Sequence, residues 1–108
     1  PGPMPMWRLS VHDKCGLFDE ELSYAGDWDM FLRMVEAGSQ FKKIDIPLGL
    51  YYYNTEGLST STEYQVPRGK EEANVFFRYK DVFGDANFHR YKNYFSQFLR
   101  ITNEEQRP

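Results

Sequence analysis

Two aspartates separated by one residue are the side chains in this sequence best suited to chemistry. They are Asp27 and Asp29, in the run Gly26-Asp27-Trp28-Asp29 at the start of a predicted helix. The N-terminus of a helix favours negative charge, and a glycine beside it lets another group approach closely. A carboxylate in that position, at the edge of a pocket, can accept a proton from a substrate hydroxyl. The alternative is an ordinary helix cap, which is the commoner reason for an aspartate at such a position.

The helix that positions these aspartates is predicted over residues 24–37. Its apolar side chains recur at helical spacing and form one stripe: Trp28, Phe31, Leu32 and Val35. Asp29 and Arg33 are four residues apart, so they can pair on the helix surface. Gly38 predicts the end of the helix, because glycine is favoured just after the last turn.

The remaining elements are predicted from periodicity and from glycine and proline. Residues 7–14 fit either a strand, because Trp7, Leu9 and Val11 alternate, or a short helix that stops at Gly16, and the helix is favoured. Helices are also predicted over residues 67–83 and 87–101, with Gly84-Asp85 as the stop between them. Residues 41–46 alternate apolar and polar and predict a half-buried strand that ends at Pro47, and residues 48–53 predict a second, aromatic extended run. The expected fold class is therefore α/β, or an α+β fragment, with short strands and about four helices.

Composition narrows the class of protein. The chain has 108 residues, the size of one domain, and its 18% aromatic content argues against disorder. A formal net charge of −3 gives no support to nucleic-acid binding. No apolar run is long enough to span a bilayer. The single cysteine, Cys15, excludes an internal disulfide, and with His12 and His89 it does not make a structural zinc site.

Several motifs follow one another in a fixed order. Gly16-Leu17-Phe18-Asp19-Glu20 is followed by Gly26-Asp27-Trp28-Asp29, and these by Arg33, Gly38, Tyr51 and Leu58-Ser59. This series resembles the C-terminal, acceptor-side half of family 2 glycosyltransferases with the GT-A fold. Pro5-Met6-Trp7-Arg8 is similar to the segment before those motifs. The resemblance covers residues 1–62 of a single 108-residue piece, with residues 63–108 as a C-terminal helical extension.

The resemblance implies a role for each motif residue. Asp27 would be the catalytic base that deprotonates the acceptor hydroxyl, which then attacks the anomeric carbon of a nucleotide sugar with inversion. Four residues would bind the acceptor: Trp7, Trp28, Asp29 and Tyr51. Three would give structural support: Phe18, Asp19 and Arg33.

The chain departs from the family pattern at two positions. Gly26 stands where many members have Glu, and Asn54 stands where many have His. Because an amide is a poorer metal ligand than an imidazole, no metal ligand is expected in this piece. The family's nucleotide and metal sites lie in an N-terminal half with an Asp-x-Asp motif. Mn²⁺ or Mg²⁺ is therefore expected in the full-length enzyme, and no cofactor is expected here.

The proline-rich start is interpreted as an internal segment of a longer protein. The partners expected for that protein are a nucleotide-sugar donor, a saccharide or lipid-linked acceptor and the missing N-terminal half, with no nucleic acid. A bacterial enzyme of surface-polysaccharide assembly is expected, cytoplasmic and either free or at the inner face of the membrane. The isolated residues are expected to lack transfer activity and to self-associate through Trp7, Tyr51 and Tyr53. The competing hypothesis is a non-catalytic binding or interaction module derived from such a fold.

Overall fold

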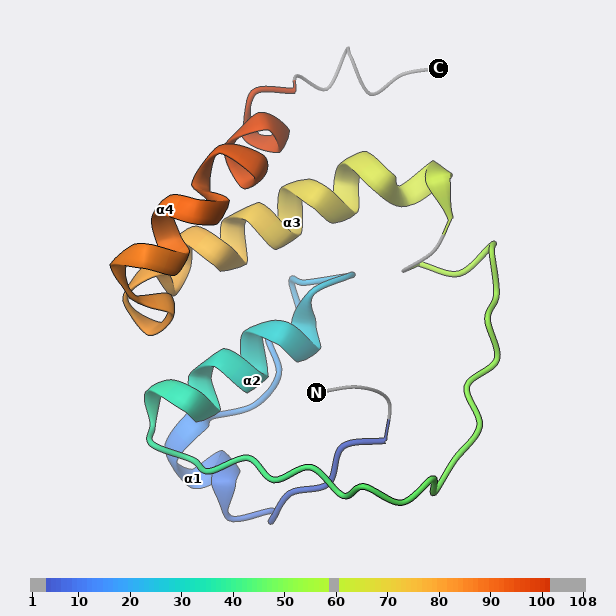
Figure 1. The fold of residues 1–108 in the computed structure, drawn as a ribbon, viewed down its shortest axis with the longest axis vertical. Helices are drawn as coiled ribbons and strands as arrows, with labels where there is room; N and C mark the ends of the chain where they lie inside the picture. Colours follow the sequence, from blue (N-terminus) through green and yellow to red (C-terminus); the bar gives the residue numbers. More distant parts are fainter. Residues whose placement is uncertain (1–3, 59–60, 102–108) are drawn as a thin grey trace.

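The computed structural model describes residues 4–58 and 61–101. In chain order, these residues form α1 (Val11–Cys15), α2 (Gly26–Glu36), the 3₁₀-helix η1 (Thr62–Tyr64), α3 (Gln65–Arg78) and α4 (Lys80–Leu99). Figure 1 shows α2 between α1 on one side and the α3–α4 pair on the other. Residues 39–58 run around the edge of the helices as one long connection. Within the described ranges, no helix is long and apolar enough to cross a membrane.

The helix predicted around the two aspartates forms, and it ends where the glycine indicates. After α2, the N–H of Ser39 donates to the carbonyl of Met34 at 2.9 Å and that of Gly38 donates to Val35 at 3.0 Å. Gly38 has a φ of 87°, which strains any residue that carries a Cβ. This pairing of bonds is the Schellman motif, so the prediction from Gly38 is confirmed.

Two hydrophobic clusters bury α2 on two sides. The cluster toward α1 contains Cys15, Met30, Phe31 and Met34, with Trp7 and Val11 packed against it. The cluster toward α3 and α4 contains Ala25, Leu32, Val75 and Tyr79, with Leu22, Trp28, Val82 and Phe83 packed against it. The predicted apolar stripe is wrong at one of its four positions, because Val35 is 43% exposed. The helix has neighbours on both sides, so Met30 and Met34, outside that stripe, are also buried. α2 is therefore the central helix of the described chain.

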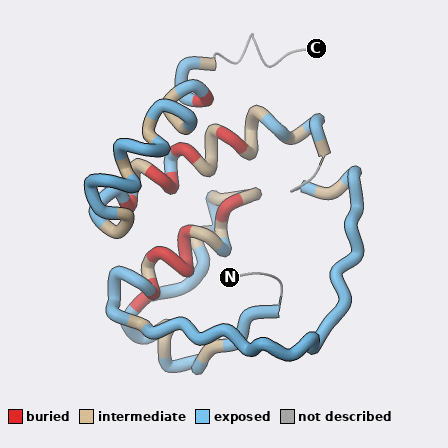
Figure 2. The backbone as a smooth tube through the Cα atoms, in the orientation of Figure 1, coloured by how far each residue is buried: buried red, intermediate tan, exposed pale blue. Residues whose placement is uncertain are grey.

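Aromatic rings hold α3 and α4 together. The ring of Phe76 on α3 stacks on that of Phe95 on α4 with centroids 4.5 Å apart, and on that of Phe88 at 5.4 Å. Farther along, a Cβ built on Gly69 would lie 2.3 Å from the ring of Phe98, so only glycine allows this approach. Figure 2 shows the buried residues concentrated in α2 and α3, with few in α1 and α4.

The C-terminal helices are interrupted at two residues, Tyr79 and the predicted stop Gly84. α3 ends at Arg78, Tyr79 is non-helical with φ −115° and ψ 32°, and α4 begins at Lys80. The single helix predicted over 67–83 is therefore wrong. Gly84, the predicted break, is non-helical with φ 77° and ψ 162°, and it separates the turn at residues 80–83 from the helix that follows, so the predicted break is confirmed within the range of α4. Tyr79 interrupts the helix, and its hydroxyl bonds to Asp29 of α2, a contact that no local pattern shows.

The predicted α/β fold class, with strands of a GT-A fold, is wrong, because residues 4–58 and 61–101 contain no strand. Residues 41–46 and 48–53 lie in the long connection, and all of them are exposed. Apolar alternation favours an extended backbone, but a strand forms only where its N–H and C=O groups find a partner strand. The described residues provide none, so this part of the molecule is a mainly helical small domain.

Candidate functional site

Asp27 presents its carboxylate to solvent in the first turn of α2. Its Oδ1 accepts a hydrogen bond from the N–H of Trp28 at 2.8 Å, one of the donors that a helix start leaves unpaired. The N-cap residue is Ala25, so Asp27 is a first-turn acid rather than the cap. Its Oδ2 makes no hydrogen bond within the described residues and is open to a ligand. This geometry suits a proton acceptor and also suits an acid that stabilises the helix dipole.

Asp29 occupies the opposite environment, with only 1% of its surface exposed. Its Oδ1 accepts hydrogen bonds from Nη1 of Arg78 at 2.9 Å and from the hydroxyl of Tyr79 at 2.8 Å. Its Oδ2 accepts from Nε of Arg33 at 3.1 Å. A buried carboxylate needs this pairing, because an unpaired buried charge is very costly. Both oxygens are thus occupied by protein donors, whereas a role in binding the acceptor needs a free one.

The predicted pairing of Asp29 with Arg33 forms, but it is not on the surface. Nη2 of Arg33 lies 3.0 Å from Oδ2 of Asp29, and Nη1 of Arg33 donates to the carbonyl of Cys15 at 2.6 Å. Arg33 therefore connects α2 to the end of α1, as a structural residue would. The surface location was wrong because Arg78 and Tyr79, at the end of α3, cover the face that carries Asp29.

The buried carboxylate affects the pKa of two of its partners. Burial by itself lowers the pKa of the Arg78 guanidinium, but the charge of Asp29 and hydrogen bonds to Asp29 and Asp19 raise it above its ordinary value. Burial raises the pKa of the Tyr79 phenol, and its hydrogen bond to Asp29 raises it further. Both side chains therefore hold their protons and remain donors to Asp29.

Asp19 joins the same network through Arg78. Nη1 of Arg78 lies 3.3 Å from Oδ2 of Asp19, whose Oδ1 accepts from the N–H of Glu21 at 3.0 Å. Arg78 thus links the loop before α2 to the end of α3. The sequence patterns did not single out Arg78, because its partners lie 49 and 59 residues away.

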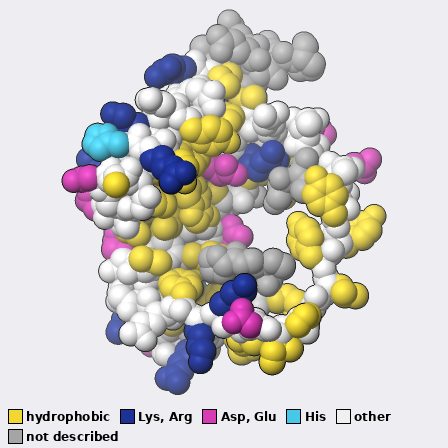
Figure 3. Space-filling view, in the orientation of Figure 1, with side chains coloured by type: hydrophobic (Ala, Val, Ile, Leu, Met, Phe, Trp, Pro, Cys, Tyr) yellow, Lys and Arg dark blue, Asp and Glu magenta, His cyan; other side chains and the backbone are white. Residues whose placement is uncertain are grey.

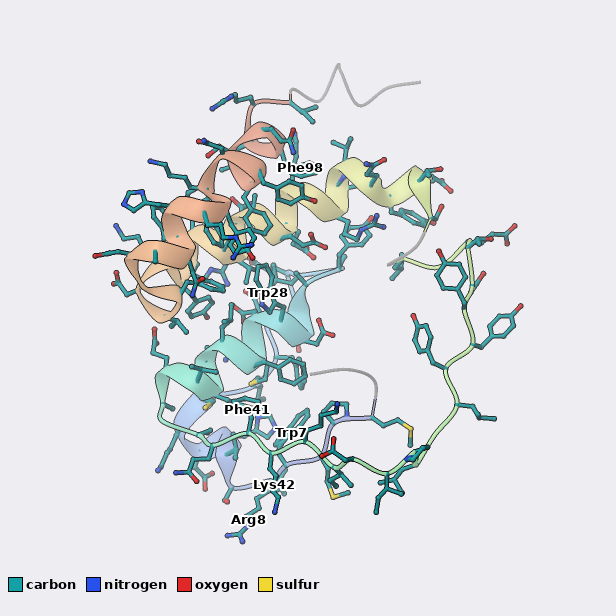
Figure 4. The ribbon with its side chains drawn as sticks, viewed as in Figure 1. Trp7, Arg8, Trp28, Phe41, Lys42 and Phe98 are labelled. Carbon is teal, nitrogen blue, oxygen red and sulfur yellow. The ribbon has the colours of Figure 1, made fainter. Side chains whose placement is uncertain are left out.

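The two tryptophans predicted to bind an acceptor lie in different clusters. The ring of Trp7 packs against Phe31 at 6.0 Å and Phe18 at 6.2 Å, and its Nε1 donates to Nε2 of His12 at 3.1 Å. Trp28 packs against Phe83 and Phe95, both at 6.0 Å. Figure 4 shows Trp28 on the side of α2 that faces α3 and α4, and Trp7 on the side of α1.

Tyr51 lies on the long connection and is exposed. Figure 3 shows hydrophobic side chains gathered along this connection, beyond the helices. The proposed acceptor residues therefore do not converge on one point: Trp7 belongs to the α1 cluster, Trp28 lies against α4, Asp29 is enclosed and Tyr51 faces outward. Their shared role stays a prediction.

Glu71 of α3 is a further residue that the sequence analysis missed. Its carboxylate accepts hydrogen bonds from three consecutive backbone N–H groups, those of Ser23, Tyr24 and Ala25. The bonds to Ser23 and Ala25 are each 2.7 Å long. A carboxylate here satisfies donors just before α2 and lies at the positive end of its dipole. Glu71 therefore holds in place the loop that leads to Asp27.

A cleft of about 650 Å³ lies between residues 19–24 and α3. Most of its lining residues are polar or charged: Asp19, Glu21, Tyr24, Lys70, Asn74 and Arg78. Asp27 does not line it. The cleft is therefore a second candidate site, separate from the carboxylate of Asp27 but bordered by Arg78, which contacts Asp29.

No family model, curated protein or solved structure matches this chain. The resemblance to family 2 glycosyltransferases thus stands on the motif residues alone. Among residues 4–58 and 61–101, no group of three or more His, Cys, Asp or Glu side chains is arranged to hold a metal ion.

Proposed function

We propose that this chain supplies the acceptor side of an inverting glycosyltransferase, with Asp27 as the catalytic base. The observation that supports this most strongly is the contrast between the two aspartates. Asp29 is enclosed and bonded through both oxygens, whereas Asp27 is exposed and keeps Oδ2 open. Of the two carboxylates, only that of Asp27 can meet a substrate hydroxyl. The proposal rests on this geometry and on the motif series, and it needs no strand in the described residues.

The chemistry follows from the open carboxylate. As the acceptor oxygen attacks the anomeric carbon, Oδ2 of Asp27 takes the hydroxyl proton and becomes a carboxylic acid. The nucleoside diphosphate leaves from the opposite face of the sugar with the electron pair of the broken C–O bond, so the configuration inverts. No residue of this chain is assigned to donor binding. The Arg78–Asp29 bond and the packing of Trp28 hold the first turn of α2 in place for this step.

The test is Asp27→Asn in the full-length protein. Asparagine keeps the shape and the hydrogen bond to the N–H of Trp28 but cannot take a proton, so kcat should fall by about 10²–10⁴-fold with donor affinity unchanged. Asp81→Asn is a matched control, because Asp81 is also an exposed first-turn aspartate, on α4. A kcat for Asp27→Asn close to that of the wild type would overturn the assignment.

A second candidate function, an interaction module, is favoured by the long connection. Its large apolar side chains are exposed, including those of Leu48, Leu50 and Tyr52, which share one face of an extended chain. Sedimentation of the 108-residue chain should then show association that Leu50→Ser together with Tyr52→Ser abolishes. This outcome, combined with a silent Asp27→Asn, would favour the module over the enzyme.

A further inference from the structure

We infer that the cleft between residues 19–24 and α3 binds a neutral saccharide. The cleft has a volume of about 650 Å³ and is largely open to solvent, so a ligand would lie along its surface. Its walls come from the loop that leads to α2 and from one face of α3, where Pro67, Lys70, Asn74 and Arg78 recur at helical spacing. Both walls are held in place, because Glu71 and Arg78 each bond across from α3.

The lining residues divide into groups already bonded and groups left open. Asp19 and Glu71 are occupied by the protein contacts described above. The side chains of Glu21, Lys70 and Asn74 make no hydrogen bond or ion pair with other described residues. They provide a carboxylate acceptor, an ammonium donor and an amide that does both. A sugar hydroxyl donates one hydrogen bond and accepts others, so this mixture matches a polyhydroxylated ligand.

The charge of the cleft argues for a neutral ligand. Three carboxylates, those of Asp19, Glu21 and Glu71, face two cations, those of Lys70 and Arg78. This small negative excess disfavours the binding of phosphate and other anions. Arg78 is already paired with Asp19 and Asp29, so it attracts an anion less strongly than a free arginine would. A strongly cationic ligand would be repelled by the two basic side chains, those of Lys70 and Arg78.

Part of the lining is apolar, as the C–H faces of a sugar ring require. Leu22, Pro67 and Tyr24, a residue with an aromatic ring, line the cleft. That ring is held by contact with Tyr64, with centroids 5.9 Å apart. Aromatic rings present flat faces with a negative quadrupole, which attract the polarised C–H groups of a sugar.

The role of the bound saccharide as part of an acceptor rests on the proposed function. The binding of a saccharide in the cleft does not depend on that function. In a glycosyltransferase, the cleft would hold a part of the acceptor remote from the reacting hydroxyl. Remote contacts of this kind orient a substrate for reaction. Arg78 borders the cleft and bonds to Asp29, two residues from Asp27, so this wall is attached to the helix that carries the proposed base.

The inference is tested by NMR titration of the ¹⁵N-labelled chain with maltotriose, cellotriose and tri-N-acetylchitotriose. At least one of them should give saturable shifts of the amides in residues 19–24 and 67–78. Lys70→Ala and Asn74→Ala should each weaken that binding about three- to tenfold, the loss of one hydrogen bond. Lys80→Ala and Asn93→Ala alter exposed residues outside the cleft and should leave it unchanged.

Three results would overturn the inference. They are no saturable shift with any of the three sugars, shifts confined to residues 41–53, or binding of only inorganic phosphate or trigalacturonate, titrated in parallel. Failure here is distinguishable from failure of the proposed function. Saccharide binding with a silent Asp27→Asn would remove only the enzyme proposal, whereas loss of turnover in Asp27→Asn without saccharide binding would remove only the cleft.

Discussion

Arg78 donates a hydrogen bond to Oδ1 of Asp29 at 2.9 Å, and the same nitrogen, Nη1, lies 3.3 Å from Oδ2 of Asp19. One atom therefore joins the end of α3 to α2 and to the loop before it. Because Asp29 is almost completely buried, this bond is shielded from solvent on the carboxylate side. The network sets how α2 lies against α3, and so where the chain presents Asp27.

The two aspartates of α2 should differ sharply in their contribution to stability. Asp29→Ala leaves Arg33, Arg78 and Tyr79 without their shared acceptor, so the free energy of unfolding should fall by about 3 kcal/mol or more. Asp27→Ala removes one first-turn acid and should cost less than about 1 kcal/mol. Urea unfolding followed by circular dichroism measures both. Equal losses for the two variants would contradict the buried network.

Tyr79→Phe should destabilise the chain in a pH-dependent way. The hydroxyl donates to a buried carboxylate, so its loss should cost about 2 kcal/mol near neutral pH. The folded state raises the pKa of the phenol, so its stabilising contribution is complete below the ordinary tyrosine pKa of about 10 and is lost as pH rises through the raised value.

The stability difference between the wild type and Tyr79→Phe should therefore narrow at strongly alkaline pH. Chemical unfolding at a series of pH values measures this difference, with Tyr91→Phe as the control for an exposed tyrosine. A difference that stays constant from neutral to strongly alkaline pH would show that Tyr79 does not donate to Asp29.

Gly69→Ala should disrupt the packing of α3 on α4. The new Cβ would lie 2.3 Å from the ring of Phe98, so the helices must separate, at a cost of about 1–3 kcal/mol. Gly26→Ala is the matched control, since its Cβ would meet Leu22 at 3.9 Å, an ordinary contact. Thermal unfolding compares the variants. The stability lost through Gly69→Ala should be smaller when Phe98 is also changed to Ala. An equal loss in that background would exclude the steric explanation.

Neighbouring glutamates on α3 should respond in opposite directions to the same substitution. Glu71→Gln weakens three hydrogen bonds to the loop before α2 and should destabilise by about 2 kcal/mol. Glu72→Gln should stabilise the folded chain at neutral pH. Burial raises the pKa of the Glu72 carboxyl, and the charge of Glu71 adds to this increase. Together they outweigh the opposite effect of Arg68.

The stability gain in Glu72→Gln should depend on pH. A raised folded-state pKa means that Glu72 favours folding at acid pH and loses this contribution as pH rises through that pKa. The gain should therefore shrink as pH is lowered through the ordinary glutamate range of about 4. Melting temperatures at a series of pH values test both variants. A destabilised Glu72→Gln at neutral pH would contradict the raised pKa.

Local features of the chain could be predicted from the sequence. The apolar spacing around Trp28, Phe31 and Leu32 indicated α2, and Gly38 indicated its end. The four-residue separation of Asp29 and Arg33 indicated their pairing. These predictions succeed because a helix brings together residues three and four positions apart, and because a positive φ selects glycine. These interactions join residues within one or two helical turns, so a local sequence pattern is enough to predict them.

Only the tertiary structure decided which of the two aspartates is enclosed. Arg78 and Tyr79 reach Asp29 across 49 and 50 residues, and Glu71 reaches the loop before α2 across 46 to 48. The alternation in residues 41–53 predicted strands, but strands need partners that the described residues do not provide. Such contacts depend on how helices pack and on which backbone groups remain unpaired. Neither leaves a periodic signal in the sequence.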